Sequence, residues 1–139
     1  MKTLTIGDLK ARIPIIQGGM GVGISLSGLA SAVANEGGIG VISAAGLGLL
    51  YKKLSPSNYT EAGNLGLAEE IRKAREKAKG IIGVNVMVAL SDFAELVKTS
   101  IAEKVDIIFS GAGLPLDLPS FLKKDSVRLW YHYMRLYTE

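Results

Sequence analysis

The chain has 139 residues, of which 48% are hydrophobic and 21% charged, and it contains no cysteine. This composition is typical of one globular domain, and it excludes disulfides, thiolate metal sites and a cysteine nucleophile. The formal net charge is +3, and no basic stripe indicates a nucleic-acid partner. Because we find neither a signal peptide nor an apolar run long enough to cross a bilayer, we expect a cytoplasmic protein without membrane partners.

Four short apolar runs predict buried strands, and they lie at residues 13–17, 38–43, 81–88 and 105–109. Each run is rich in Ile and Val and is bounded by Gly or by a charged residue. The runs at 81–88 and 105–109 also lack the polar alternation of a strand with one wet face. This indicates that both of their faces are covered, as in a parallel sheet.

Helical patterns separate the apolar runs. Residues 25–38 begin with two candidate N-caps, Ser25 and Ser27, and end in glycines. Residues 64–80 and 91–105 place apolar side chains at helical spacing. The first helix also has a face of small residues that can approach a sheet closely: Gly28, Ala30 and Ala34. The order β-α-β-α-β-α-β predicts right-handed βαβ units.

The connection over residues 44–64 is longer than the other connections. We predict that it forms a loop over the strand ends, with a short helix near 49–54.

A glycine-rich stretch, QGGMGVG at residues 17–23, follows the first apolar run. Glycine lets the backbone approach a ligand closely, and parallel α/β sheets bind ligands at the carboxyl ends of their strands. The Rossmann pattern G-x-G-x-x-G is not satisfied, because Leu26 stands where its third glycine is needed. These glycines therefore either form ordinary βα turns or line the floor of a site for a large, flat ligand.

Asn85 is a polar residue inside the apolar run at 81–88. A buried amide needs hydrogen-bond partners. Either a ligand or the protein itself must provide them.

Three stretches closely resemble the nitronate monooxygenases, formerly called 2-nitropropane dioxygenases. They are IPIIQGGMGVGISLSGLASAVANEGGIGVIS at 13–43, GVNVMVAL at 83–90 and IIFSGAGLPLDLP at 107–119. The resemblance covers about 9–122. It implies an FMN-dependent TIM barrel that oxidises alkyl nitronates, its small-molecule substrates, with O2 to a carbonyl compound and nitrite.

A complete barrel needs eight βα units and ~250 residues. The resemblance is therefore to the N-terminal half alone. We expect an α/β fold that is a partial (β/α)8 TIM barrel of about four parallel βα units, formed by residues 1–122.

The resemblance also implies which residues contact FMN, and all of them lie at the predicted strand ends. They are Gly19, Met20, Gly21, Ser43, Asn85, Gly111 and Ala112. The catalytic histidine and the FMN phosphate site of the family lie in its second half, so we predict no catalytic residue and no metal ligand here. The only histidine, His132, has no glycine near it, and we interpret it as a surface or packing residue. The chain alone is therefore expected to have little nitronate-oxidising activity.

Two alternatives remain open at this stage. One is a protein like the related flavin-dependent enoyl-acyl-carrier-protein reductases. The other is a non-catalytic half-barrel. In either case the open edges of a partial sheet invite self-association into a homo-oligomer.

Residues 123–139 differ in composition from the rest of the chain. They hold the only Trp, the only His and three of the five Tyr. We interpret them as a divergent tail that arises from another reading frame or from a truncated product. An amphipathic stripe over 127–137 predicts that this tail is helical and packs over the open edge of the barrel.

Overall fold

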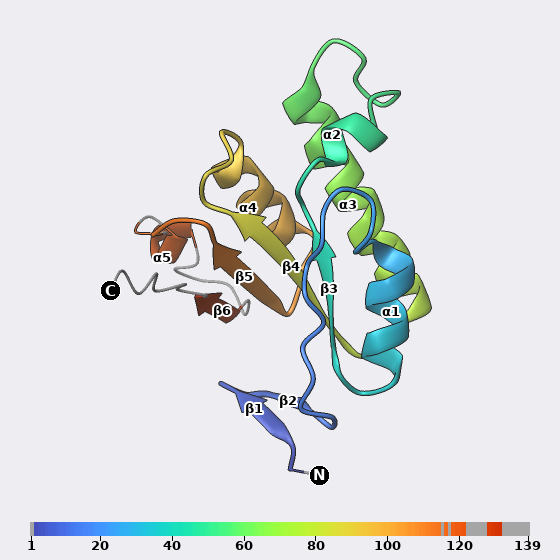
Figure 1. Ribbon diagram of the computed structural model, residues 1–139, viewed down its shortest axis with the longest axis vertical. Coiled ribbons are helices and arrows are strands. Elements are labelled where there is room, and N and C mark those ends of the chain that lie inside the picture. The colour runs from blue at the N-terminus through green and yellow to red at the C-terminus, as the bar shows by residue number, and fades with distance from the viewer. Residues whose placement is uncertain (1, 115, 117, 122–127, 132–139) are drawn as a thin grey trace, which may run out of the picture.

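The structure is a computed structural model that describes residues 2–114, 116, 118–121 and 128–131. In chain order its elements are β1 (Leu4–Ile6), β2 (Leu9–Ala11), α1 (Ser27–Asn35), β3 (Ile39–Ser43), α2 (Leu47–Leu50), α3 (Tyr59–Lys77), β4 (Ile81–Met87), α4 (Phe93–Ala102), β5 (Ile107–Gly111), α5 (Leu118–Phe121) and β6 (Arg128–Tyr131). Strands β3, β4, β5 and β6 form a parallel sheet in that order, and helices α1, α3 and α4 lie along one side of it (Figure 1). The predicted α/β architecture, part of a TIM barrel, is confirmed.

Alternate residues of the strands face two different apolar layers. Side chains such as Ile42, Val84 and Ile108 are fully buried against the helices. The opposite face carries Val41 and Phe109, which belong to a second apolar cluster. Both faces of the central strands are therefore covered, as the uninterrupted apolar runs predict.

The hairpin formed by β1 and β2 was not predicted. Its strands pair antiparallel, and Gly7, with a φ of 60°, makes the turn between them. Ile6 and Ala11 belong to the same cluster as the first residues of the sheet strands, so the hairpin covers the amino-terminal end of that face (Figure 1). Its strands have only three residues each, too few to show a period.

The first apolar run is not a regular strand, and that prediction is wrong. Its only β-bridge among the described residues joins Ile16 to Ile39. The chain runs parallel to β3 for a few residues, with the Gln17 N–H donating to the Ile39 carbonyl at 3.0 Å. It then leaves the sheet and crosses the end of β3.

The helices occur where the patterns place them, but several of their starts differ. Helix α3 begins at Tyr59, with Asn58 as its N-cap accepting a hydrogen bond from the Glu61 N–H at 3.1 Å. Helix α1 begins at Ser27 without a side-chain cap from its own first residues. The small face of α1 is confirmed for Ala30 and Ala34, which are buried, and wrong for Gly28, which is exposed.

The short helix of the long connection, α2, begins two residues before the predicted range of 49–54 and ends within it.

The predicted tail helix is wrong for Arg128–Tyr131. These residues form β6, which pairs parallel with β5. His132 and the rest of the tail lie outside the described residues. In the part of the chain that the structure covers, no helix has the length and apolarity to cross a bilayer, and no cluster of acidic residues with His or Cys has the makeup of a metal site.

Candidate functional site

A pocket of about 510 Å³ opens at the carboxyl ends of β3, β4 and β5. The first apolar run, the turn that follows it and the inner faces of the strands line this pocket: Ile16, Gln17, Gly18, Gly19, Val41, Asn85, Met87, Phe109, Gly111 and Ala112. We call it the rim pocket. Its walls are apolar apart from the two amide side chains and the backbone of the glycine-rich segments.

The rim pocket brings together four of the residues predicted to contact a flavin: Gly19, Asn85, Gly111 and Ala112. The other three do not line it. Met20 is 61% exposed, Gly21 packs against Ala45, and Ser43 is buried beneath that turn.

Asn85 lies on the pocket side of β4, because its neighbours Val84 and Val86 face the helices. The residue is half-buried, and its side-chain amide forms no hydrogen bond to any described residue. The alternative of a structural hydrogen bond within the protein therefore finds no partner in this part of the chain. The amide remains able to donate to and accept from a ligand.

Gly19 lies directly over Asn85. A Cβ atom at position 19 would be 2.4 Å from the Asn85 Cβ atom, a separation that side chains do not tolerate. Glycine is therefore required here by the close approach of the loop to the strand. Because it has no side chain, the backbone itself forms this part of the pocket wall.

Ser43 is the cross-strand neighbour of Asn85 on the same face of the sheet. It is 2% exposed, and its Oγ has no hydrogen-bond partner among the described residues. The Oγ lies 3.3 Å from the position that a Cβ atom would take at Gly21. Ser110 Oγ, which is also buried and unpartnered in the described part, lies on β5 on the helix side of the sheet. The sequence places Ser110 at the end of its apolar run, but Ser110 was not among the predicted flavin contacts.

Gln17 and Ser25 hold the turn over the rim pocket, and sequence analysis did not assign either of them this role. Ser25 Oγ accepts from the Met20 N–H at 2.9 Å and donates to the Gly18 carbonyl at 3.0 Å. Ser25 is therefore not the N-cap that the sequence suggested, because its hydroxyl is used by the loop. A polar residue ending an apolar run was the available signal for Gln17.

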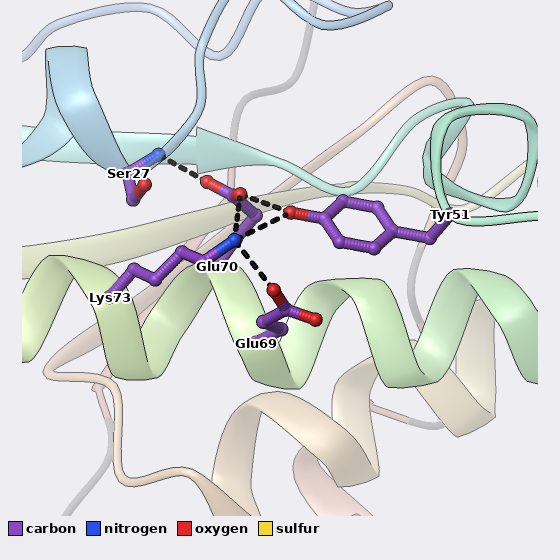
Figure 2. Close-up of polar contacts among 5 residues, drawn as sticks. All are labelled: Ser27, Tyr51, Glu69, Glu70 and Lys73. Carbon is purple, nitrogen blue, oxygen red and sulfur yellow. Dashed lines mark hydrogen bonds and ion pairs between the residues drawn. The ribbon is translucent and has the colours of Figure 1, made fainter. Parts of the chain in front are cut away.

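A group of ionisable side chains lies away from the rim pocket, between α1, α2 and α3 (Figure 2). Glu70 is 4% exposed, and its carboxylate accepts from the Ser27 N–H at 2.6 Å and from the Tyr51 hydroxyl. Lys73 lies 2.6 Å from Glu69 and 3.8 Å from Glu70. We call these residues the helix junction. The Glu70 carboxylate accepts from the first N–H of α1 and so performs the capping role that was predicted for a serine. Its negative charge also interacts favourably with the positive end of the helix dipole.

The pKa values of three groups in the helix junction are shifted, those of Tyr51, Glu70 and Lys73. Burial, together with the hydrogen bond to Glu70, raises the pKa of Tyr51 to about 12. Burial alone would raise the pKa of Glu70, but the hydrogen bonds from Tyr51 and Ser27 outweigh it and hold that pKa below its ordinary value. The contacts of the Glu70 carboxylate with the start of α1 and with Tyr51 give the junction a structural role, since they join the helices.

The helix junction makes stability depend on alkaline pH. Since the folded pKa of Tyr51 is raised from 10.0 to about 12, its contribution is complete below pH 10 and is lost as the pH rises towards the folded value. We expect the urea midpoint of the protein to fall over this interval, and to fall less in Tyr51→Phe. Equal pH slopes for the two proteins in urea titrations would contradict the assignment. Glu70 also stabilises the fold, but its contribution depends on pH in the opposite direction. It is complete above the ordinary pKa of 4.5 and is lost as the pH falls below that value.

A second, apolar groove of about 330 Å³ lies between the first apolar run and α1. Ile13, Ile15, Ala32, Val33, Glu36 and Gly38 line it.

The parallel sheet with helices on one side is part of a TIM barrel, and the rim pocket lies at the carboxyl ends of its strands, where TIM barrels carry their sites. A family model described as nitronate monooxygenase matches residues 2–118. The chain belongs to this family of flavin-dependent oxidoreductases, which confirms the resemblance found in the sequence. No curated protein sequence gives a significant match.

Two solved proteins show the same fold. FabK from Thermotoga maritima is 28% identical with a TM-score of 0.66, over 85% of this chain and 33% of that one. The structure of its M276A mutant is 30% identical with a TM-score of 0.67, and the match covers 85% of this chain and 34% of the mutant. A nitroalkane oxidase from Streptomyces ansochromogenes is 17% identical with a TM-score of 0.67, over 86% and 40%, and it supports the fold alone. The chain thus spans about a third of the length of FabK.

Proposed function

We propose that the rim pocket binds the ring system of FMN, and that the chain thereby serves the oxidation of alkyl nitronates by O2 to a carbonyl compound and nitrite. The observation that carries this proposal is the Asn85 amide, which has no hydrogen-bond partner among the described residues and lies in a pocket walled partly by glycine backbone. The match to the nitronate monooxygenase family supports the substrate class.

The rim pocket suits a wide, planar ring. Its volume of about 510 Å³ falls within the usual range for sites that bind small molecules. Val41, Met87 and Phe109 offer apolar surface, while Asn85 and the backbone at Gly19 and Gly111 offer polar atoms near the ring edge. A flavin held by these residues would supply the redox chemistry that electron transfer from a nitronate to O2 requires.

The residues of this chain bind and orient the ring and keep water from one of its faces. No ionisable side chain lines the rim pocket in the described part of the chain. A general base typically contributes about 10²–10⁴-fold to a rate, and these residues offer none. We therefore propose cofactor contacts but no catalytic residue, and we expect turnover of propyl-2-nitronate by the 139-residue chain to be slow.

Replacing Asn85 by alanine is expected to weaken FMN binding by about fivefold, because the loss of one hydrogen bond is worth roughly 1 kcal/mol. Quenching of flavin fluorescence on titration with protein measures the dissociation constant. Asn35→Ala is the matched control, since the Asn35 amide donates to the Lys77 carbonyl on the exposed helix side. A wild-type chain that quenches no flavin fluorescence would refute the proposal, and equal losses in the two variants would remove the role of Asn85.

A further inference from the structure

We propose that Gln17 is a positioning residue for the rim loop, defined here as residues 18–24. Its side chain takes the place of the next rung in the ladder beside β3 and so determines where the loop backbone lies over Asn85. The inference rests on the proposed flavin site, because Gln17, Gly18 and Gly19 form one wall of the rim pocket.

The hydrogen-bond ladder beside β3 shows that the Gln17 side chain replaces a backbone acceptor. The Ile39 N–H donates to the Ile15 carbonyl at 2.9 Å, and the Gln17 N–H donates to the Ile39 carbonyl at 3.0 Å. In a regular parallel ladder the next donor, the Val41 N–H, would bond the backbone carbonyl of Gln17. It donates instead to the side-chain Oε1 of Gln17 at 2.9 Å. The side chain thus completes the ladder, and the backbone is released to turn away at this residue.

The need for this acceptor is strong. Val41 is 1% exposed, and a buried N–H without a partner costs about as much as a lost hydrogen bond. Because the Val41 N–H can only donate, it also fixes the orientation of the amide. Oε1 must face β3, and the amino group of Gln17 must face the rim loop.

The amino group of Gln17 holds both ends of the rim loop. It donates to the Gly18 carbonyl at 2.5 Å and to Ser25 Oγ at 2.9 Å. Ser25 Oγ in turn binds the Met20 N–H and the Gly18 carbonyl. One hydroxyl has one donor and two acceptor positions, so every hydrogen-bonding position of Ser25 is occupied. The rim loop therefore has one fixed path from the edge of β3 across the pocket.

A positioning role for Gln17 predicts a result that a purely structural role does not. If Gln17 sets the loop path, its loss must move the backbone at Gly19 and thereby change flavin affinity. A residue that only stabilises the fold would lower the free energy of unfolding and leave the affinity of the folded protein unchanged.

The test uses the variants Gln17→Ala, Gln17→Glu and Ser25→Ala. Ser31→Ala is the control, because Ser31 is 5% exposed and its hydroxyl donates to the Gly28 carbonyl within α1. Amide hydrogen exchange of Val41 and Met20, measured without flavin, reports on the hydrogen bonds that Gln17 and Ser25 accept from these two N–H groups. Fluorescence titration with FMN reports on the site.

For Gln17→Ala we expect exchange at Val41 and Met20 to be faster by about tenfold or more, and FMN affinity to fall by about tenfold. Gln17→Glu keeps the acceptor for Val41 but points a second oxygen at the Gly18 carbonyl, so affinity falls while exchange at Val41 stays near the wild-type rate. Ser25→Ala speeds exchange at Met20 only and weakens FMN binding. Ser31→Ala leaves exchange and affinity unchanged.

The inference is overturned if Gln17→Ala exchanges Val41 at the wild-type rate, or if it binds FMN as tightly as the wild type. If Gln17→Ala does not fold, the affinities of Gln17→Glu and Ser25→Ala decide by the same criterion. A wild-type chain that binds no FMN refutes the proposed function, and this inference with it, whereas normal binding by both wild type and variants refutes the inference alone.

Discussion

Replacing Gly40 by alanine is expected to destabilise the protein by about 3 kcal/mol or more, at the upper end of the cost of overpacking a core. A Cβ atom at Gly40 would lie 1.8 Å from the Ala30 carbonyl oxygen of α1 and 2.6 Å from its carbonyl carbon. The contact is with backbone, so no side-chain rotation relieves it. The whole of α1 would have to move away from β3 and open the layer between them. Urea unfolding, with the midpoint and slope fitted separately, measures the loss.

Gly28→Ala is the matched control for this prediction. Gly28 lies within α1, and a Cβ atom there would meet nothing within 4 Å. Because alanine has the higher helix propensity, we expect this variant to be more stable by about 0.5–1 kcal/mol. If the two substitutions had the same effect, the direct packing of α1 on β3 would be contradicted.

Replacing Glu70 by alanine is expected to cost about 3 kcal/mol, because two donors lose a charged acceptor and each such hydrogen bond is worth about 1.5–3 kcal/mol. The substitution leaves the Ser27 N–H and the Tyr51 hydroxyl without their acceptor in a region that water reaches poorly. The first N–H of α1 loses its acceptor, and the hydrogen bond that joins Tyr51, at the end of α2, to α3 is lost at the same time (Figure 2).

Two further variants isolate the role of the Glu70 carboxylate, with thermal and urea unfolding as the measurement. Glu69→Ala removes the exposed neighbour, whose side chain is 42% exposed against 5% for Glu70, and it is expected to leave stability nearly unchanged. Glu70→Gln keeps an acceptor for Ser27 and is expected to lose less than Glu70→Ala. A large loss in Glu69→Ala, or none in Glu70→Ala, would show that the helix junction does not support the fold.

The sequence predicts the sheet well where strands are covered on both faces. A continuous apolar run identifies such a strand without any knowledge of its neighbours in the sheet, as it does at 38–43, 81–88 and 105–109. It fails where a distant residue replaces a local one. The cap of α1 comes from Glu70, more than forty positions further along the chain, and no local pattern shows such a contact. The run at 13–17 fails for a related reason, since a side chain of that run completes its ladder.

The candidate site was predictable in outline. The strand ends and the family resemblance together predicted seven flavin contacts, and four of those residues line one pocket: Gly19, Asn85, Gly111 and Ala112. The apolar walls and the part played by Gln17 were not predictable, because apolar strand residues look alike in a sequence whichever face they occupy. The domain boundary at 122, the origin of the tail, the cytoplasmic location and self-association through open sheet edges remain predictions.

The most direct test of the flavin site is an NMR titration of the isotopically labelled chain with FMN. The account predicts that the largest changes in amide chemical shift occur at the rim pocket, at Gly18, Gly19, Asn85 and Gly111, with little change along the apolar groove beside α1. Changes centred on that groove, or no change at the rim pocket at FMN concentrations that quench its fluorescence, would contradict it.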